Sequence, residues 1–533
     1  MLLVSCTSPG VDYLVEGDIY YEQGQVTDAI IAYTTAIQSD PNNAEAYYRR
    51  GWVYQQQEDY EKAVADYTKA TEIDPDHIKA YNQRGIIYGR LGTYDAAIAD
   101  FSRAIELDPN YADAYNNRGI VYRNKGEYDL ALADFTKAIE INPDHSLAYH
   151  NRGLLYAEGG QNSAAIADLT SSIQLDPGYA DSYYRRGLVY FDIVNYDTAI
   201  ADFTTAIQLT VDYADAYYSR GATYLEIGND DLAFSDFSKV IQIAPSYADA
   251  YYKRGEIFLG WGQIADAIAD YSMTIQLAPD YADAYEKRGN CYFQQGEYSQ
   301  AIWDYGKAID LDPSRADAYY NRGDSYAALG DHENAVLDFT KVIELDPNRS
   351  SAYRHRGLSY YETGREDKAI NDFTKAIELY PDYATAYNNR GIIRAKKGEY
   401  DSAISDFTRA IEIDHSYADA YNNRGLVYST IGEYDSAISD YTTALGIDPN
   451  HALAYNNRGI AYYEKEDHVA AYNDLSKAVQ LMPTYAEAYY YRGLVYSAVG
   501  YTADAINDFN KCIELSQDPG LTARAQQEIE ALQ

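Results

Sequence analysis

An arginine–glycine pair returns every 34 residues along this 533-residue chain. Fifteen glycines run from Gly17 to Gly493 at that interval without an insertion or deletion, and an arginine precedes each of them except Gly17, which follows Glu16. A strict period of about 20–50 residues is typical of solenoids, in which one supersecondary element is stacked many times. Proline recurs at one phase of the same period, so no stretch between repeats is long enough for a separate domain.

The repeat at residues 78–111 is predicted to form two short antiparallel helices. Gly92 should end the first helix, and Tyr94 and Asp95 should provide the hydrophobic staple and the N-cap of the second. A lone hairpin of this kind cannot bury the apolar stripes of both helices, so the repeats must stack. The first stripe consists of Tyr81, Gly85, Tyr88 and Leu91, and the second of Ala97, Ile98, Phe101, Ala104, Ile105 and Leu107.

Two recurring features predict how the helices of a repeat meet. Gly85 and Ala97 lack bulk where two helix backbones would approach, and alanine occupies the Ala97 position in all fifteen repeats. Fourteen repeats carry an aspartate such as Asp100 in the second helix, and the first repeat, which lacks it, also lacks the arginine. This joint absence predicts that Arg84 pairs with Asp100 of its own repeat, and such a pair specifies geometry more than it adds stability.

The repeat resembles the tetratricopeptide repeat (TPR), a helical hairpin with a fixed set of aromatic, small and proline positions. The matching residues of the third repeat are Tyr81, Arg84, Gly85, Tyr88, Ala97, Phe101, Ala104 and Pro109, with tyrosine and arginine in place of the usual tryptophan and leucine. The resemblance implies an all-α fold, a right-handed α-solenoid superhelix of antiparallel helical hairpins whose first helices line a concave groove. We therefore predict a leader over residues 1–9, fifteen TPR repeats over residues 10–517, and a C-terminal capping helix over residues 518–533.

The charge balance bears on the class of partner. Acidic residues outnumber basic ones by 82 to 43, which gives a net charge of −39. A nucleic-acid binder needs a basic stripe that displaces counterions from phosphates, so we expect no nucleic-acid partner. Two interpretations of the acidity stay open: it keeps an elongated molecule soluble, or it attracts basic segments of partner proteins.

The first nine residues lie outside the period and bear on localisation. Leu3-Val4-Ser5-Cys6 resembles the lipobox of bacterial lipoproteins, although a complete signal also needs a basic region and an apolar region of about 7–15 residues. Two alternatives stay open: a cytoplasmic protein that starts at Met1, or an exported protein anchored through a lipidated Cys6 if the true start lies upstream. No stretch approaches the roughly 18 apolar residues of a transmembrane span.

No motif predicts catalysis. No glycine-rich phosphate loop follows a predicted strand, and the eight histidines lack the spacing of zinc ligands. Cys6, Cys291 and Cys512 fit neither a zinc site nor a disulfide framework. We therefore expect no enzymatic activity, no cofactor and no metal site.

The positions that vary between repeats carry the remaining functional information. By the TPR resemblance, the groove is lined by the two residues that follow the first-helix tyrosine and by residues just past the glycine. In repeats six to eight these residues are aromatic or apolar: Tyr184, Tyr218, Tyr252, Phe191, Leu225 and Leu259. The tyrosines either bind a partner peptide or lean onto the adjacent repeat, and both interpretations stay open.

In other repeats the two positions after the tyrosine are asparagines. They are Asn82, Asn116, Asn117 and Asn151 in repeats three to five, and Asn388, Asn389, Asn422, Asn423, Asn456 and Asn457 in repeats twelve to fourteen. An amide can donate to and accept from an extended peptide backbone without reading its side chains. The arrangement is similar to the asparagine ladder of the O-GlcNAc transferase TPR superhelix, in which asparagines hold peptide main chains.

These patterns predict a non-catalytic protein–protein interaction scaffold. It would bind extended peptides or partner helices in the concave groove, and basic segments would be favoured by its charge. The alternative function is a structural or self-assembling surface spacer, tethered to a membrane through Cys6.

Overall fold

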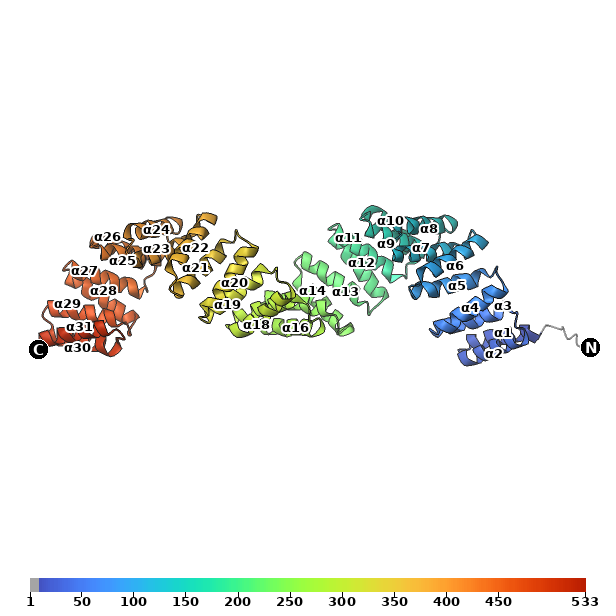
Figure 1. Cartoon of the computed structure of the whole chain (residues 1–533), viewed down its shortest axis with the longest axis horizontal. Helices are drawn as coiled ribbons and strands as arrows, with labels where there is room; N and C mark the ends of the chain where they lie inside the picture. The colour runs from blue at the N-terminus through green and yellow to red at the C-terminus, as the bar shows by residue number, and fades with distance from the viewer. Residues whose placement is uncertain (1–8) are drawn as a thin grey trace, which may run out of the picture. The chain divides into compact units, whose positions relative to one another are not determined.

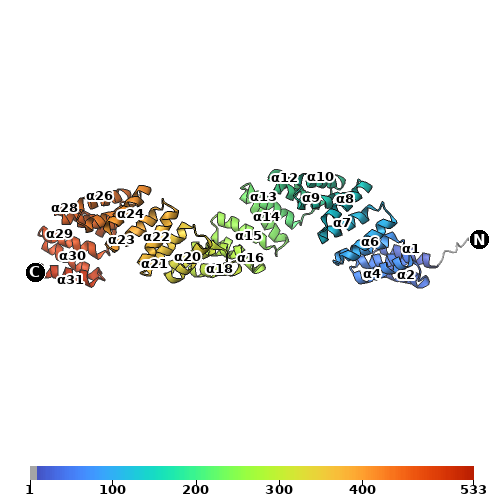
Figure 2. The same cartoon turned by 45° about the horizontal axis from the view of Figure 1, so that its top comes forward.

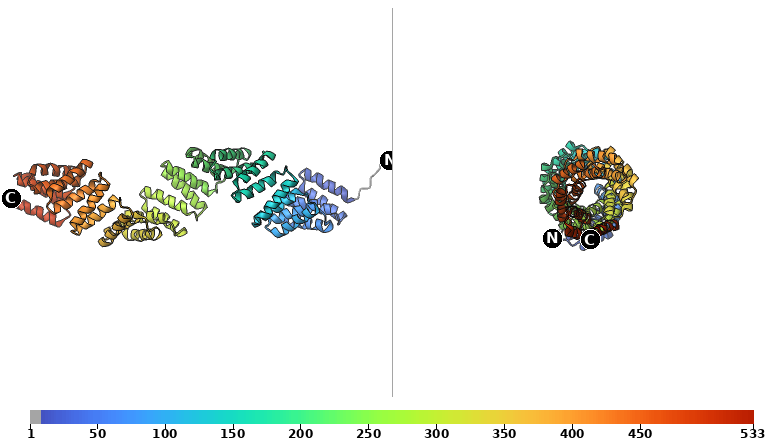
Figure 3. Two further views of the ribbon diagram at one scale, coloured as in Figure 1. Left: turned by 90° about the horizontal axis from the view of Figure 1, so that it is seen from above. Right: turned by 90° about the vertical axis from the view of Figure 1, so that its left-hand side faces the viewer.

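The computed structural model describes residues 9–533, and every regular element in that range is an α-helix (Figure 1). The chain divides into two compact units, an N-terminal unit (Met1–Trp261) and a C-terminal unit (Gly262–Gln533). Within each unit, consecutive helices pair as hairpins and the hairpins stack side by side (Figures 2 and 3). The predicted all-α fold of stacked helical hairpins is confirmed.

The helices of the N-terminal unit are 13 or 14 residues long. They are α1 (Pro9–Glu22), α2 (Val26–Ser39), α3 (Ala44–Gln56), α4 (Tyr60–Ile73), α5 (Ile78–Arg90), α6 (Tyr94–Leu107), α7 (Ala112–Lys125), α8 (Tyr128–Ile141), α9 (Ser146–Glu158), α10 (Asn162–Leu175), α11 (Ala180–Asp192), α12 (Tyr196–Leu209), α13 (Ala214–Glu226), α14 (Asp230–Ile243) and α15 (Ala248–Gly260).

The helices of the C-terminal unit have the same lengths. They are α16 (Ile264–Leu277), α17 (Ala282–Gln294), α18 (Tyr298–Leu311), α19 (Ala316–Ala328), α20 (His332–Leu345), α21 (Ser350–Glu362), α22 (Glu366–Leu379), α23 (Ala384–Lys396), α24 (Tyr400–Ile413), α25 (Ala418–Thr430), α26 (Tyr434–Ile447), α27 (Ala452–Glu464), α28 (His468–Leu481), α29 (Ala486–Ala498), α30 (Thr502–Leu515) and α31 (Pro519–Leu532).

The turn inside each hairpin is made by one residue in the left-handed region of backbone space. In twelve repeats that residue is a glycine, such as Gly92 with φ of 72°, which confirms the predicted end of the first helix. The other three repeats place Glu58, Val194 and Glu466 there, with φ between 60° and 62°. Because a side chain at positive φ crowds its own backbone, these three turns are strained, Val194 most of all since it is β-branched.

The second helix begins earlier than the sequence indicated. The N-cap of α6 is Thr93, and Asp95 lies in the first turn of that helix. The prediction of an N-cap at Asp95 was therefore wrong by two residues, because the helix starts as soon as the chain leaves Gly92. The carboxylate of Asp95 still favours the helix, since it lies near the partial positive charge of the N-terminus.

The two helices of a hairpin meet at the repeat glycine. A Cβ added to Gly85 would lie 2.8 Å from the ring atom Cε1 of Phe101, so the glycine is needed for this approach. The ring of Phe101 and the methyl group of Ala97 are buried. Gly85 therefore meets the ring of Phe101, and Ala97 belongs to the same buried cluster as that ring.

The repeat arginine joins neighbouring repeats as well as its own helices. Arg84 donates from Nε and Nη2 to the two carboxylate oxygens of Asp100 at 2.8 and 2.7 Å, which confirms the predicted pair. Its Nη1 also donates to the hydroxyl of Thr68 in the preceding repeat at 3.0 Å. The guanidinium lies 5.5 Å from the ring centre of Tyr81. One side chain thereby sets the geometry both within and between repeats.

The last helix covers the end of the final repeat. Leu521, Ala525 and Ile529 of α31 are buried against Phe509 and Cys512 of α30. The predicted capping segment, residues 518–533, contains this helix, whose N-cap is Asp518. The leader cysteine, Cys6, lies outside the described residues. No described helix combines the length and the apolar character that crossing a membrane requires.

Candidate functional site

The first helices of neighbouring repeats lie against one another within each unit. In the N-terminal unit α7 contacts α5 and α9, and in the C-terminal unit α25 contacts α23 and α27. Among the described residues, second helices of neighbouring repeats make no contact of similar extent. The first helices therefore form the more closely packed face of each stack, which is the face that the sequence assigns to binding.

Asparagines on three of these helices are hydrogen-bonded from repeat to repeat. We call Asn82 of α5, Asn116 and Asn117 of α7, and Asn151 of α9 the N-terminal ladder. Asn117 donates from Nδ2 to the Oδ1 of Asn82 at 3.2 Å, and Asn151 donates in the same way to Asn116 at 2.9 Å. These bonds hold each amide in one orientation before any partner arrives.

The C-terminal unit repeats this arrangement on α23, α25 and α27. We call Asn388, Asn389, Asn422, Asn423, Asn456 and Asn457 the C-terminal ladder. Asn423 donates to Asn388 and Asn457 donates to Asn422, both at 3.1 Å. The ladder stops at Asn456, whose Oδ1 is buried and has no hydrogen-bond partner among the described residues. It stops there because the following repeat carries Tyr491 where the next amide would lie.

The two asparagines of a repeat have different surroundings. The first of each pair is buried between neighbouring first helices, and the second is partly exposed. The buried set is Asn82, Asn116, Asn388, Asn422 and Asn456, and the partly exposed set is Asn117, Asn151, Asn389, Asn423 and Asn457. Only the second set can offer an amide to a partner. Asn117, Asn151, Asn423 and Asn457 of that set are each oriented by a buried asparagine of the preceding repeat.

A cavity of about 270 Å³ opens between α5 and α7 beside the N-terminal ladder. Ile86 and Ile120 form apolar walls, and Asn117 and Asn124 add amide groups. Gly89 also lines the cavity and leaves room for it, because the other fourteen repeats all have a side chain at this position. The sequence analysis did not single out Gly89. It could have done so, because Gly89 is the one glycine at this position among the fifteen repeats.

The predicted tyrosines of repeats six to eight pack inward and onto neighbours. The ring of Tyr184 lies 5.0 Å from that of Tyr213, and the ring of Tyr218 stacks at 5.1 Å on that of Tyr247. Tyr213 and Tyr247 are the N-caps of the next first helices, α13 and α15. Tyr252 is buried. Both ring contacts therefore join one first helix to the start of the next.

The apolar residues predicted one turn past the glycine are more accessible. Phe191, Leu225 and Leu259 are each partly exposed on α11, α13 and α15. The ring of Phe191 also contacts Tyr196 at 5.5 Å. These side chains continue the apolar surface of the first helices beyond the N-terminal ladder.

Several acidic groups on the first helices are bound to the next repeat. His145 Nε2 lies 3.2 Å from a carboxylate oxygen of Asp113, while its Nδ1 accepts the backbone N–H of Ala148 at the start of α9. The contact with His145 lowers the pKa of Asp113. Tyr213 donates to Asp181 at 2.6 Å at the equivalent place two repeats later. Some of the acidic side chains therefore bind the start of the next first helix.

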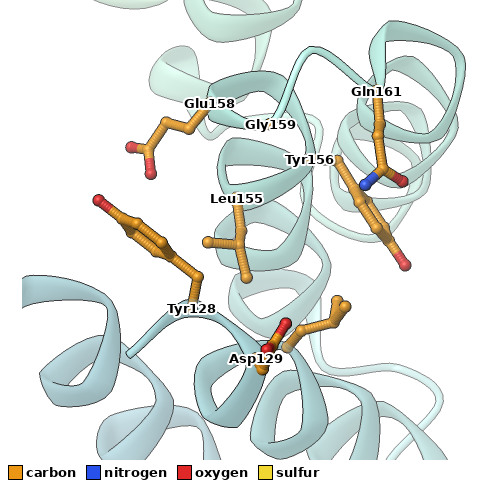
Figure 4. Close-up of a pocket in the computed structure, with 8 residues that line it drawn as sticks. Tyr128, Asp129, Leu155, Tyr156, Glu158, Gly159 and Gln161 are labelled. Atoms are coloured by element: carbon orange, nitrogen blue, oxygen red, sulfur yellow. The ribbon is translucent and has the colours of Figure 1, made fainter. Parts of the chain in front are cut away.

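A further cavity lies at the edge of the stack, where a second helix meets the end of the next first helix. In the N-terminal unit it has about 270 Å³ and lies between α8 and α9 (Figure 4). Tyr128 and Asp129 at the start of α8 face Leu155 and Glu158 of α9 there. Its lining mixes apolar and acidic groups.

The equivalent edge of the C-terminal unit is more apolar. A cavity of about 400 Å³ lies there against α28 and α29, lined by Val469, Tyr472, Val499 and Tyr501 among others. Val469 is 74% exposed and Tyr501 is 61% exposed. Other repeats carry mostly polar residues at the Val469 and Tyr501 positions, so this edge differs locally from the rest of the array.

Comparison with known families agrees with the geometry. A family model described as TPR repeat matches residues 17–58, 90–126, 153–193, 195–228, 261–296, 289–330, 357–398 and 393–432, which together exceed half of the chain. Models described as tetratricopeptide repeat match residues 44–77, 112–145, 316–349 and 418–451, then 66–99 and 135–167, and also 214–247 and 486–519. The chain belongs to the tetratricopeptide repeat family. TPR arrays are generally modules for protein–protein interaction, and this chain is a scaffold of that class.

Three solved structures are among those similar to this TPR chain. The APC/C hetero-tetramer Cut9–Hcn1 is 18% identical, over 97% of this chain and 96% of that one, with a TM-score of 0.39. MamA is 31% identical over 31% of this chain and 96% of its own, with a TM-score of 0.30. YrrB, titled a TPR protein with an unusual peptide-binding site, is 26% identical over 34% and 95%, with a TM-score of 0.30. No curated protein matches the chain.

Proposed function

We propose that the protein is a non-catalytic scaffold that binds an extended peptide segment of a partner protein along its first helices. The observation that carries this proposal is the cavity beside the N-terminal ladder, where apolar walls and oriented amides meet. Amides serve the main chain of a peptide because they both donate and accept, and Ile86 and Ile120 can receive an apolar side chain.

The net charge of the chain indicates which kind of peptide segment it would bind. The net charge of −39 repels acidic peptides at a distance and attracts basic ones. The ladder amides carry no charge, so they do not add to this selection. We therefore expect a segment with apolar side chains at its centre and basic residues around it.

Selection from a phage-displayed library of random nonapeptides on the full-length chain tests the proposal. Selected peptides should bind a variant that carries alanine at Asn117, Asn151, Asn423 and Asn457 about tenfold more weakly, because each ladder loses two hydrogen bonds at about 1 kcal/mol or less each. Ser219→Ala is the matched control, since Ser219 occupies the same position in repeat seven outside either ladder. Selected peptides that bind the ladder variant as tightly as the control would exclude this face as the site.

The alternative, a surface spacer tethered through Cys6, makes different predictions. Mass spectrometry of the protein from its source should then find an acylated N-terminal cysteine, and light scattering should find assembly that grows with concentration. An unmodified N-terminus and a constant monomer mass would contradict the spacer and leave the peptide-binding proposal standing.

A further inference from the structure

The same combination of amides and aliphatic residues occurs twice, once in each compact unit. Asn388 follows Asn82 by nine repeats. The hydrogen bonds between side-chain amides have similar lengths in the two ladders, 2.9–3.2 Å in the first and 3.1 Å in the second. The residue just past the glycine is aliphatic in all six repeats concerned. These residues are Ile86, Ile120 and Leu154 beside the N-terminal ladder, and Ile392, Leu426 and Ile460 beside the C-terminal ladder.

Repeats six to eleven interrupt the pattern. Their two positions after the tyrosine hold aromatic or charged residues in most cases, such as Tyr184 and Arg185 on α11 or Glu286 on α17. On α21 the same place holds Arg354, which donates to the hydroxyl of Tyr383 at 2.7 Å. One amide pair remains in this stretch, where Asn321 on α19 donates to Asn290 on α17 at 3.0 Å. Asparagines in consecutive repeats at the two positions after the tyrosine occur only in the two separate groups of three repeats.

The spacing of the ladders sets the length of segment that each can hold. Packed helices lie about 8–10 Å apart. An extended chain advances about 3.3 Å per residue, so it meets one amide about every third residue. Three neighbouring first helices then span a segment of about nine residues. Over that length the N-terminal ladder offers two partly exposed amides, Asn117 and Asn151, and the C-terminal ladder offers three. The aliphatic residues between the amides favour apolar side chains at the same interval of three.

We propose that the two ladders are equivalent binding stations for one class of segment, so that a single chain binds two copies of it. This inference rests on the function proposed above. The segment is extended, about nine residues long, apolar at every third position and basic at its ends. A partner that carries two copies of such a segment would engage both stations at once. Its affinity would then rise by about 10²–10⁴ if its linker spans the two sites.

Calorimetric titration of the full-length chain with one probe peptide tests the inference. The probe is acetyl-Lys-Ala-Ile-Thr-Ala-Ile-Thr-Ala-Lys-amide, which has isoleucine at an interval of three and basic ends. The wild-type chain should bind two probe molecules. Asn117→Ala with Asn151→Ala, and separately Asn423→Ala with Asn457→Ala, should each leave one molecule bound at close to wild-type affinity.

The variant with all four substitutions should bind the probe about tenfold more weakly at both stations. Circular dichroism checks that each variant is folded, and Ser219→Ala should bind two molecules as the wild type does. Should a variant be unfolded, Leu426→Glu replaces the C-terminal change and Ile120→Glu the N-terminal one, since Leu426 is 48% exposed and Ile120 is partly exposed. Each of these should also reduce the bound number from two to one.

The outcomes separate the two proposals. One bound molecule in the wild type, abolished by the N-terminal change and unaffected by the C-terminal change, would overturn the equivalence of the ladders and keep the proposed function. No binding of the probe at millimolar concentration would overturn both, because a site that reads the main chain tolerates the sequence of the probe. Two probes joined by flexible linkers of increasing length should bind about a hundredfold more tightly at some length.

Discussion

The repeat glycine and a second glycine of the same repeat should respond to alanine in opposite directions. A Cβ at Gly289 would lie 2.8 Å from Cε1 and 3.0 Å from Cδ1 of the buried ring of Tyr305. The ring cannot slide away, because its hydroxyl donates to Asn290 at 2.8 Å. A Cβ at Gly306, in the middle of α18, would meet only Arg322 Nη1, at an ordinary 3.6 Å.

The magnitudes follow from two opposing terms. Alanine is favoured over glycine inside a helix by about 0.5–1 kcal/mol, and this gain is common to both sites. Overpacking of a closely packed core costs about 1–3 kcal/mol, and a contact below 3.0 Å with an anchored ring belongs at the upper end. Gly289→Ala should therefore destabilise its repeat by about 1–2 kcal/mol, and Gly306→Ala should stabilise it by about 0.5–1 kcal/mol.

Hydrogen exchange followed by mass spectrometry is the suitable assay, because a long repeat array need not unfold in two states. Amides of α17 and α18 should exchange about tenfold faster in Gly289→Ala and a few-fold more slowly in Gly306→Ala, while those of α3 should not change. Equal protection in Gly289→Ala and the wild type would refute the argument that the glycine is required by the ring.

Three further predictions concern the turns, the ion pairs and the contacts between repeats. Val194→Gly should stabilise its hairpin by about 1 kcal/mol, because it removes a β-branched side chain from φ of 62°; slower exchange in α11 and α12 would show this. Arg84→Met should destabilise by about 3–5 kcal/mol in urea unfolding because it leaves Asp100 buried without its partner, and adding Asp100→Leu should recover most of that loss. Contacts with His77 at 3.4 Å and with Arg49 at 2.7 Å lower the pKa of Glu45 from 4.5 to about 2. The stability that ionised Glu45 contributes is therefore complete above pH 4.5 and is lost as the pH falls towards 2. The urea midpoint of the wild type should therefore approach that of Glu45→Gln over this range, and a constant difference between them would contradict the assignment.

Much of the fold follows from the sequence because its determinants are local and repeated. The helix lengths, the turn at Gly92 and the meeting of Gly85 with Phe101 all act within one repeat of 34 residues. The pairing of Arg84 with Asp100 was predictable because both residues are absent from the first repeat. The start of α6 was not, since Asp95 suits an N-cap and a first turn equally well.

Contacts between repeats were decided only by the tertiary structure. The sequence treats Asn116 and Asn117 alike, yet the packing of α7 between α5 and α9 buries the first and leaves the second partly exposed. The bond from Arg84 to Thr68 likewise joins two repeats. Periodicity specifies which residues recur, whereas the direction in which each side chain points depends on the neighbouring helix that it meets. The candidate site is formed by those neighbours, and for that reason only the folded stack could define it.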